Sequence, residues 1–364
     1  MNSHVKYVIT IPSIDIPGHI SIHDLILLGS NDDCYQQLKK ANTFLAKYLD
    51  SFRSPFSTKI NPSIVVRDEN LGKVNSDHLV SFRNAIAVSS VIYSRMRSCL
   101  LQRATGCTGT DLFDFHPVSV SNDGNDFSVK TASTIGMDNR IDEFKGQTTL
   151  SEPYPESIRF ESDEELTLSL LNLIEKKYNK IKDKEFRNRV IRSTGMVYYA
   201  LRAPFTQLGN KTDFGVAMCL WVSAFEIIAY HYKTGADVNS NDVSSLIQSI
   251  PWQNSRLRKT NRVGVYGKSN KLKRKSKTTL PVQIYRRLYH TRNMYLHGNP
   301  IPKNNYEFKT RKNWGNLFFQ VPVLFRCVLM HLLKTKGCIP ATQDTTLQNN
   351  YETVLLMTKS PQKT

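Results

Sequence analysis

The sequence predicts an α+β N-terminal domain followed by an all-α helical bundle. Over the first 160 residues, short runs typical of strands are separated by two helical patterns. From residue 161 to 337, apolar residues recur almost throughout at helical spacing. A chain of 364 residues is long enough for two domains with cores of their own. We therefore expect domains at 1–160 and 161–337, then a polar, loosely ordered tail at 338–364.

Strands are expected in the N-terminal domain. Residues 5–11 alternate apolar and polar side chains, residues 20–28 form a second apolar stretch, and residues 64–66 form a short third. Residues 112–120 are expected to form one more strand, followed by a polar loop rich in Ser, Asn, Asp and Gly. The sequence of this domain indicates no function for it.

Two helices are expected between and after these strands. The first is marked by side chains three or four residues apart, at Tyr35, Leu38, Ala41, Leu45, Tyr48 and Leu49. The second is marked in the same way by Leu79, Phe82, Ile86, Tyr93, Met96 and Leu100.

The C-terminal domain is expected to run from helix to helix. Ser162, with Glu165 three residues later, is a capping-box start for the first helix. The next helix is expected at 185–205. The last, at 313–334, is apolar on nearly all sides and contains Pro322, which predicts a kinked helix buried in a bundle.

Between these helices lies one that carries Glu226. Thr212 or Asp213 is expected to cap its start, and Gly235 to end it. A basic, loop-like segment at 254–278 then leads into the helix with the candidate site.

The candidate site lies near the end of that helix, in the sequence LYHTRNMYLHGNP of residues 288–300. It contains Arg292, Asn293 and His297, and the glycine and proline that follow stop the helix, so the histidine falls in the last turn. Asn293 and His297 are four residues apart and share a face. An adjoining face carries Tyr285, Leu288, Tyr289, Arg292 and Leu296.

These residue types suit metal-free cleavage of RNA. An RNA strand breaks when its 2′-hydroxyl attacks the adjacent phosphate, and a protein accelerates this with a proton donor or acceptor and a cation that stabilises the phosphorane. His297 can supply the first and Arg292 the second. A helix C-terminus favours positive charge, which suits His297 as a general acid. The alternative is structural, because Arg and His near a helix end also cap carbonyl groups.

The pattern R-N-x-x-x-H at a helix end resembles the motif of the HEPN superfamily, whose Arg and His mark many metal-independent ribonucleases and some non-catalytic relatives. The preceding helix, FGVAMCLWVSAFEII at 214–228, resembles that of the Apea-like HEPN group, with Phe225 where that pattern commonly has Leu. The resemblance covers roughly residues 164–336 and leaves the first 160 without a family.

The resemblance implies a HEPN-like helical bundle and an endoribonuclease that needs no metal or cofactor. It makes Arg292 and His297 the catalytic pair, Asn293 a positioning or phosphate-contacting amide, and Glu226 a supporting polar residue. It also implies a toxin or antiviral defence role, with an inhibitory or activating partner that the sequence does not identify.

Composition indicates a polyanionic partner. The chain has 49 Lys and Arg against 31 Asp and Glu, a formal net charge of +18. Residues 243–306 contain Lys and Arg but no Asp or Glu. The expected RNA-binding cations are Arg256, Arg258, Lys259, Arg262, Lys268, Lys271, Lys273, Arg274, Lys275 and Lys277. The alternatives are a solvated basic linker or a nuclear-import-like patch.

The same sequence argues against several other classes. No stretch suggests a membrane span or a leader, so we expect a cytoplasmic protein that does not bind membranes. Six cysteines without CxxC spacing are expected to be reduced thiols. The nine histidines are scattered, and no zinc motif occurs.

One Arg-Asn-His set supplies few groups for acid, base and phosphate clamp together. Arg292 and His297 are five residues apart, roughly 140° around a helix axis. Two copies related by a two-fold axis can pool both sets, which predicts a homodimer with a composite active site. Two other functions stay open: a non-catalytic nucleic-acid-binding or scaffold protein, and a HEPN-type protein that binds a small nucleotide.

Overall fold

The computed structural model describes residues 8–22, 25–67, 76–103, 105–120, 125–131, 133–147, 154, 157–175, 184–202, 211–230, 237–266, 272–301, 303–309, 314–339 and 344–356. Contacts divide the chain into two units, Met1–Val91 with Thr105–Ser162, and Ile92–Ala104 with Asp163–Thr364. The boundary falls inside helix α3 (Ser76–Leu101), whose last part belongs to the second unit. The two units are therefore not separated at a single position in the sequence.

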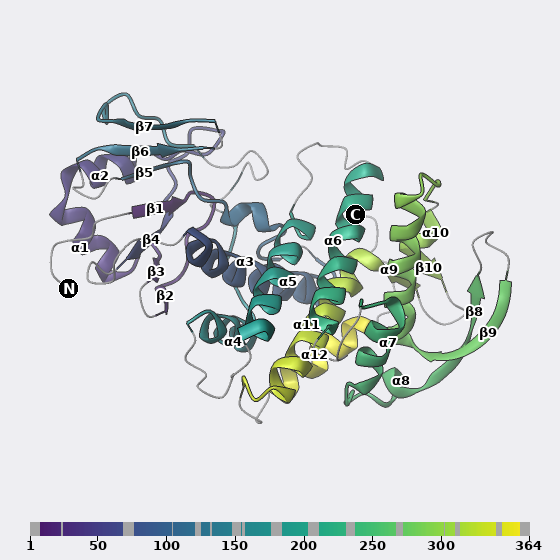
Figure 1. Ribbon diagram of the computed structural model, residues 1–364. Helices are drawn as coiled ribbons and strands as arrows, with labels where there is room; N and C mark the ends of the chain where they lie inside the picture. The colour runs from purple at the N-terminus through teal and green to yellow at the C-terminus, as the bar shows by residue number, and fades with distance from the viewer. Residues whose placement is uncertain are drawn as a thin grey trace. The chain divides into compact units, whose positions relative to one another are not determined.

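A seven-stranded antiparallel sheet, in the order β2-β3-β4-β1-β5-β6-β7, forms the framework of the N-terminal unit (Figure 1). Its strands are β1 (Val8–Ile11), β2 (His19–Ile22), β3 (Leu25–Leu28), β4 (Ser63–Arg67), β5 (Val118–Val120), β6 (Phe127–Lys130) and β7 (Ile135–Asp138). The apolar stretch 20–28 forms two strands rather than one, because it contains the β2–β3 turn. Strand β1 lies between β4 and β5 and is buried along its whole length, as its apolar composition requires.

The helix expected around residues 35–49 is two helices, α1 (Asp33–Ala41) and α2 (Thr43–Asp50). Asn42 separates them, because its backbone is extended and its side chain accepts a hydrogen bond from the Leu45 N–H at 2.9 Å. That is N-cap chemistry, which periodicity alone does not reveal. Tyr48 of α2 is fully buried against the sheet residues of the core.

The expectation for residues 112–120 was largely wrong. Thr110–Phe113 forms a 3-10 helix, and only Val118–Val120 is a strand. The polar region that follows is not merely a loop, since it contains the hairpin β6–β7. Phe127 of β6 is buried against Phe44 and Tyr48, so this aromatic side chain anchors the strand in the core.

The second unit is mainly helical (Figure 1). Its main helices are α4 (Glu164–Ile174), α5 (Lys184–Ala200), α6 (Lys211–Ala229), α7 (Ser240–Ser249), α9 (Leu280–Leu296), α11 (Leu317–Thr335) and α12 (Thr345–Leu356). Helix α5 packs on α6, and α6, α9 and α11 pack on one another. The α+β region followed by a helical part is therefore confirmed at this level.

The helix ends differ from their predicted positions. Asp163, not Ser162, caps α4, because its carboxylate accepts a hydrogen bond from the Leu166 N–H at 2.9 Å. Helix α6 begins before Thr212 and Asp213, so neither is its cap, and Gly235 lies outside the described residues.

Helix α11 is the core of the bundle. It begins at Leu317 with Asn316 as its N-cap, contains Pro322, and is buried along most of its length. Among the described helices it alone is long and apolar enough to cross a membrane, but 78% of its apolar window is buried inside the protein. A core helix passes the same test, so this is weak evidence for a membrane span.

The basic segment is not a loop. Residues 254–278 contain the short helix α8 (Ser255–Arg258) and most of a β-hairpin, β8 (Thr260–Tyr266) with β9 (Leu272–Thr279). In this register Arg262 of β8 stands opposite Lys277 of β9. Because basic residues dominate these strands, the alternation of apolar and polar side chains that usually predicts a strand is weak here.

The tail contains helix α12, so the expectation of a loosely ordered 338–364 was wrong for 345–356. Tyr351, Val354 and Leu355 are buried, as is the carboxylate residue Glu352. Such a helix looks polar in the sequence because its buried face includes charged and amide side chains. The last eight residues lie outside the described part.

Candidate functional site

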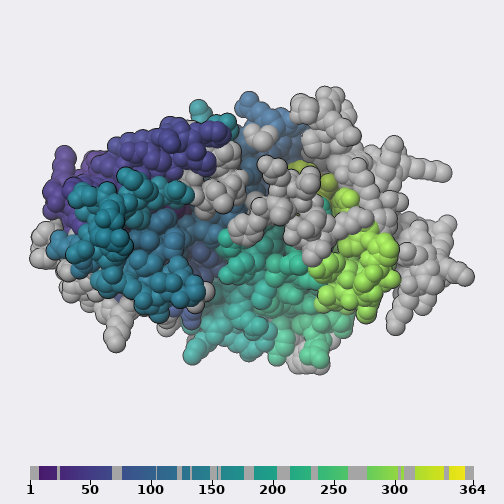
Figure 2. All heavy atoms as spheres, turned by 90° about the horizontal axis from the view of Figure 1, so that it is seen from above, coloured from purple at the N-terminus to yellow at the C-terminus, as the bar shows by residue number. Residues whose placement is uncertain are grey.

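Helix α9 carries most of the candidate site. Pro281 stands in its first turn, and Tyr285 and Leu288 bury one face in the bundle. The helix ends at Leu296, and Gly298 takes the left-handed conformation with φ 68°, which favours glycine. On the face shown in Figure 2, the light-green segment around this end of α9 reaches the surface.

Arg292 is held between two predicted site residues. Its Nη1 donates a hydrogen bond to Asn293 Oδ1 at 2.9 Å, and its Nη2 lies 4.0 Å from Glu226 Oε2 on α6. Its guanidinium carbon also lies 5.3 Å from the centre of the Tyr289 ring, within reach of a cation–π contact. The side chains of Arg292 and Glu226 each keep 23% of their exposure, so the group is open to solvent.

Glu226 has an electrostatic environment of its own. Partial burial raises the pKa of its carboxyl, while the guanidinium of Arg292 acts in the opposite direction. The net shift is upward, so the loss of water outweighs the attraction of the arginine. The 4.0 Å separation is consistent with this, because a closer ion pair would hold the carboxylate more firmly.

His297 stands apart from that group. It is the C-cap residue of α9, its side chain is exposed, and its backbone N–H donates to Asn293 O at 3.1 Å. Across the described residues, no hydrogen bond or ion pair joins it to Arg292. The structure therefore brings together Arg292, Asn293 and Glu226, and leaves His297 at the helix end.

A glycine on α6 fixes how this end of α9 packs. A Cβ added at Gly215 would lie 2.1 Å from the ring of Tyr295, so only glycine allows the ring to sit there. Tyr295 follows Arg292 by three residues and precedes His297 by two. The contact thus positions the part of α9 that carries both candidate residues.

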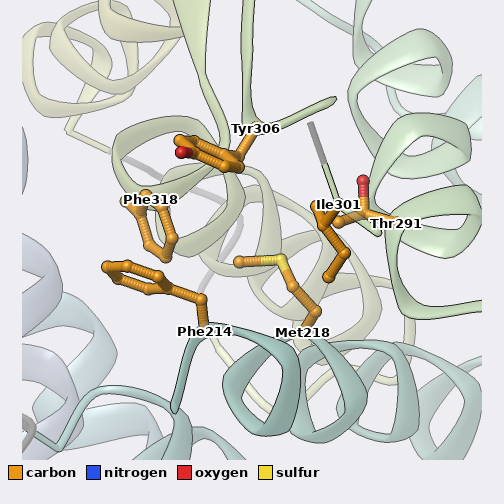
Figure 3. A pocket seen from close by; sticks show the side chains of 6 residues that line it. All are labelled: Phe214, Met218, Thr291, Ile301, Tyr306 and Phe318. Atoms are coloured by element: carbon orange, nitrogen blue, oxygen red, sulfur yellow. The ribbon is translucent and has the colours of Figure 1, made fainter. Parts of the chain in front are cut away.

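A small apolar pocket lies on one side of α9 (Figure 3). Its side chains come from four helices and a loop and are Phe214, Met218, Thr291, Ile301, Tyr306 and Phe318. Phe214, Tyr306 and Phe318 group together, while Met218 and Ile301 lie next to each other (Figure 3). The Thr291 hydroxyl donates to the Arg287 carbonyl, so its proton is already engaged.

The predicted RNA-binding cations divide into three groups. Four are exposed near the base of the hairpin, namely Arg256, Arg258, Lys259 and Lys277. Four others are on its strands, Arg262, Lys273, Arg274 and Lys275. Lys268 and Lys271 lie outside the described residues.

Two aromatic residues of the site were not foreseen as functional. Tyr285 is fully buried, and its hydroxyl has no hydrogen-bond partner among the described atoms. Burial, followed by the charge of Glu226, raises its pKa, so the phenol stays protonated. Tyr289 lies under Arg292. Tyr289 lies three residues before Arg292 and four after Tyr285, and this helical spacing was the available signal.

Other chemistry finds little support in the described part of the chain. It holds no group of three His, Cys, Asp or Glu residues that could bind a metal ion. All six cysteines are free, and burial raises the pKa of Cys107 and Cys327 to about 12. Such thiols are poor nucleophiles. No family model, no curated protein and no solved structure matches this chain.

Proposed function

We propose that this protein is a metal-independent endoribonuclease of HEPN type. The observation that carries the proposal is the partly exposed Arg292 of α9, which contacts Asn293 and lies near Glu226 of α6. The same helix α9 exposes His297 at its end. A cation and an imidazole in these positions suit a reaction on a phosphodiester. The HEPN assignment itself rests on the motif resemblance.

In the proposed reaction the RNA supplies its own nucleophile. The 2′-oxygen loses its proton to a general base and bonds to phosphorus, the bond to the 5′-oxygen breaks, and His297 gives that oxygen a proton. The products are a 2′,3′-cyclic phosphate and a 5′-hydroxyl end. Arg292 offsets the charge on the phosphorane.

The proposal includes a homodimer with a composite site. Because Arg292 and His297 project from different sides of α9, one phosphate is reached most easily by the arginine of one copy and the histidine of another. Mixing Arg292→Ala and His297→Ala proteins before assembly should restore part of the activity. A fully active protein that light scattering shows to be monomeric would exclude the composite site.

The exposed cations at the base of the hairpin are proposed to attract RNA. Changing Arg256, Arg258, Lys259 and Lys277 to Ser should weaken binding and flatten its salt dependence by up to about 0.7 per lost single-strand phosphate contact. An unchanged salt slope would exclude this surface. A toxin or antiviral role belongs to the proposal through the resemblance, and a cytoplasmic location through the expectation from the sequence.

One observation favours a second candidate, a protein that binds nucleic acid or a nucleotide without cleaving it. The Arg292 guanidinium already contacts Asn293 and Glu226, so it has a structural role whether or not it meets a phosphate. Persistent ATP binding without RNA binding would indicate a nucleotide-binding protein.

The deciding experiment is incubation of the purified protein with RNA in EDTA. Cleavage should persist, leave cyclic phosphate ends, and be absent with DNA or 2′-methoxy RNA. Arg292→Ala and His297→Ala should be nearly inactive. Arg189→Ala is the matched control, because Arg189 also contacts a tyrosine ring and a glutamate, Tyr230 and Glu185, but on α5. A need for Mg²⁺ or 5′-phosphate products would overturn the mechanism.

A further inference from the structure

The solvent side of α9 carries a polar stripe that includes a second histidine. A helix turns about 100° per residue, so positions 286, 290, 293 and 297 fall within about 60° of one another. They hold Arg286, His290, Asn293 and His297. Arg286 and His297 are exposed, and His290 and Asn293 are partly exposed. The stripe lies opposite the face that buries Ile284, Leu288 and Thr291.

Its second histidine has the spacing of an acid–base partner. His290 and His297 are seven residues apart, which is about 10.5 Å along the helix axis at about 1.5 Å per residue. Two imidazoles at this separation leave room for one phosphodiester between them. Arg292 does not belong to the stripe, since it faces Glu226.

Asn293 lies between the two histidines along the stripe. Its Oδ1 accepts the hydrogen bond from Arg292, which leaves the amide nitrogen as a donor. That donor suits a phosphate oxygen held between the imidazoles. Arg292 thereby orients Asn293 even where its own guanidinium does not reach the same phosphate.

The surroundings of His290 favour its neutral form. Partial burial, then the positive charge of Arg287, lower its pKa from the ordinary value of 6.5. Carboxylates on the neighbouring helices are engaged elsewhere: Glu226 of α6 faces Arg292, and Asp242 of α7 accepts from the Asn239 N–H at 2.8 Å. A neutral imidazole near pH 7 accepts a proton.

We propose that His290 is the general base of the reaction, acting on the same strand of RNA as His297. This inference rests on the proposed ribonuclease function. His290 takes the proton of the 2′-hydroxyl, the 2′-oxygen bonds to phosphorus, and the 5′-oxygen leaves with a proton from His297. The two histidines exchange protonation states in the step, and water or buffer restores them. A single strand of RNA then runs along α9 across the stripe.

The test compares His290→Gln with His331→Gln. His331 of α11 is also a partly buried histidine whose pKa is lowered by burial, but it contacts Ser249 on α7 instead of the stripe. His290→Gln should reduce kcat by about 10²–10⁴-fold. It should still bind uncleavable 2′-methoxy RNA with wild-type affinity. His331→Gln should match the wild type in both.

The pH profile separates a base from a structural residue. Wild-type kcat should fall at acidic pH as His290 becomes protonated, at a lower pH than for an ordinary imidazole because its pKa is lowered, and His290→Gln should lose this acidic limb. A His290→Gln protein with near wild-type kcat and an unchanged acidic limb would overturn the inference while the ribonuclease stands. No cleavage by the wild type in EDTA would instead overturn the ribonuclease, and this inference with it.

Discussion

Arg326 on α11 and Arg292 on α9 belong to the same helical unit, yet they differ in how many of their hydrogen-bond donors are engaged. Arg326 is fully buried. Its Nε, Nη1 and Nη2 donate to Asp163 at 2.9 Å, Gln348 at 2.7 Å and Glu165 at 3.1 Å. Arg292 is partly exposed and makes one short hydrogen bond, to Asn293. An arginine whose nitrogens are all engaged has little left for a ligand, whereas Arg292 retains donors near solvent.

Sequence separation explains why only one of them was recognised as a candidate. Arg326 and Asp163 are 163 residues apart, so no local pattern links them. Arg292, Asn293 and His297 lie within six consecutive residues. A short motif can be recognised in the sequence. A buried network of residues that are far apart in the sequence is recognised only in the folded structure.

The largest expected effect is on stability and tests this comparison directly. Arg326→Ala should lower the free energy of unfolding by about 3–5 kcal/mol, because Asp163 would be left as an unpaired buried charge. Arg292→Ala should cost about 1 kcal/mol or less, since its partner lies at 4.0 Å and is partly solvated. Urea unfolding measures both. Equal losses in the two variants would show that the comparison is wrong.

The next largest expected effect concerns Glu352, which links helix α12 to the base of the basic hairpin. Glu352 accepts hydrogen bonds from the Gln253 and Asn254 N–H groups at 3.0 and 2.7 Å, just before α8. Glu352→Ala should leave two donors without this partner, at a cost of about 1–3 kcal/mol for each that stays buried. Hydrogen exchange at residues 253 and 254 should accelerate. Unchanged protection there would mean that Glu352 does not secure the hairpin base.

Gly215→Ala should affect the candidate site more than the fold. The new methyl group would meet the Tyr295 ring, and overpacking of this kind costs about 1–3 kcal/mol. We expect the end of α9 to shift and cleavage to fall. Tyr295→Ala in the same protein should relieve the clash, so the double variant should be more stable than the sum of single losses predicts. Strict additivity would mean that the two residues do not interact.

The smallest effect concerns pH. Because the pKa of Glu226 is raised above 4.5, the folded protein binds more protons than the unfolded chain just above that pH. This group therefore makes stability fall as pH rises from about 4.5 through its raised pKa. Glu226→Gln should show a flatter pH dependence of unfolding across that interval. A steeper one would mean that Arg292 dominates the environment of Glu226.

Periodicity predicted some elements well and others poorly, for physical reasons. Helix α3 was expected because its apolar residues repeat at helical spacing. The strands of the basic hairpin were not predicted, since only Val263 and Val265 alternate in β8 and most of β9 is Lys, Arg, Ser and Thr. Helix α12 escaped because it buries amide and carboxylate groups against Arg326 and the hairpin base, which makes its buried face look polar.

The candidate site shows the same limits. The local motif singled out Arg292, Asn293 and His297, and the helix before it pointed to Glu226. The contact between Arg292 and Asn293 appeared only in the structure. Gly215 could not be recognised, because its role depends on a ring that packs from another helix. No local sequence rule distinguishes an arginine whose donors are all hydrogen-bonded, such as Arg326, from one with donors left for a ligand.

The position of Glu352 has a consequence for biosynthesis. A ribosome makes residues 253 and 254, the hairpin and α9 well before it makes the carboxylate that receives those two N–H groups. Gln348, a partner of Arg326, is also added late. Translation that stops before α12 would therefore release chains that carry every proposed catalytic residue but lack these supports. Such fragments should be rapid substrates for cellular proteases, so only a bundle completed by α12 would persist.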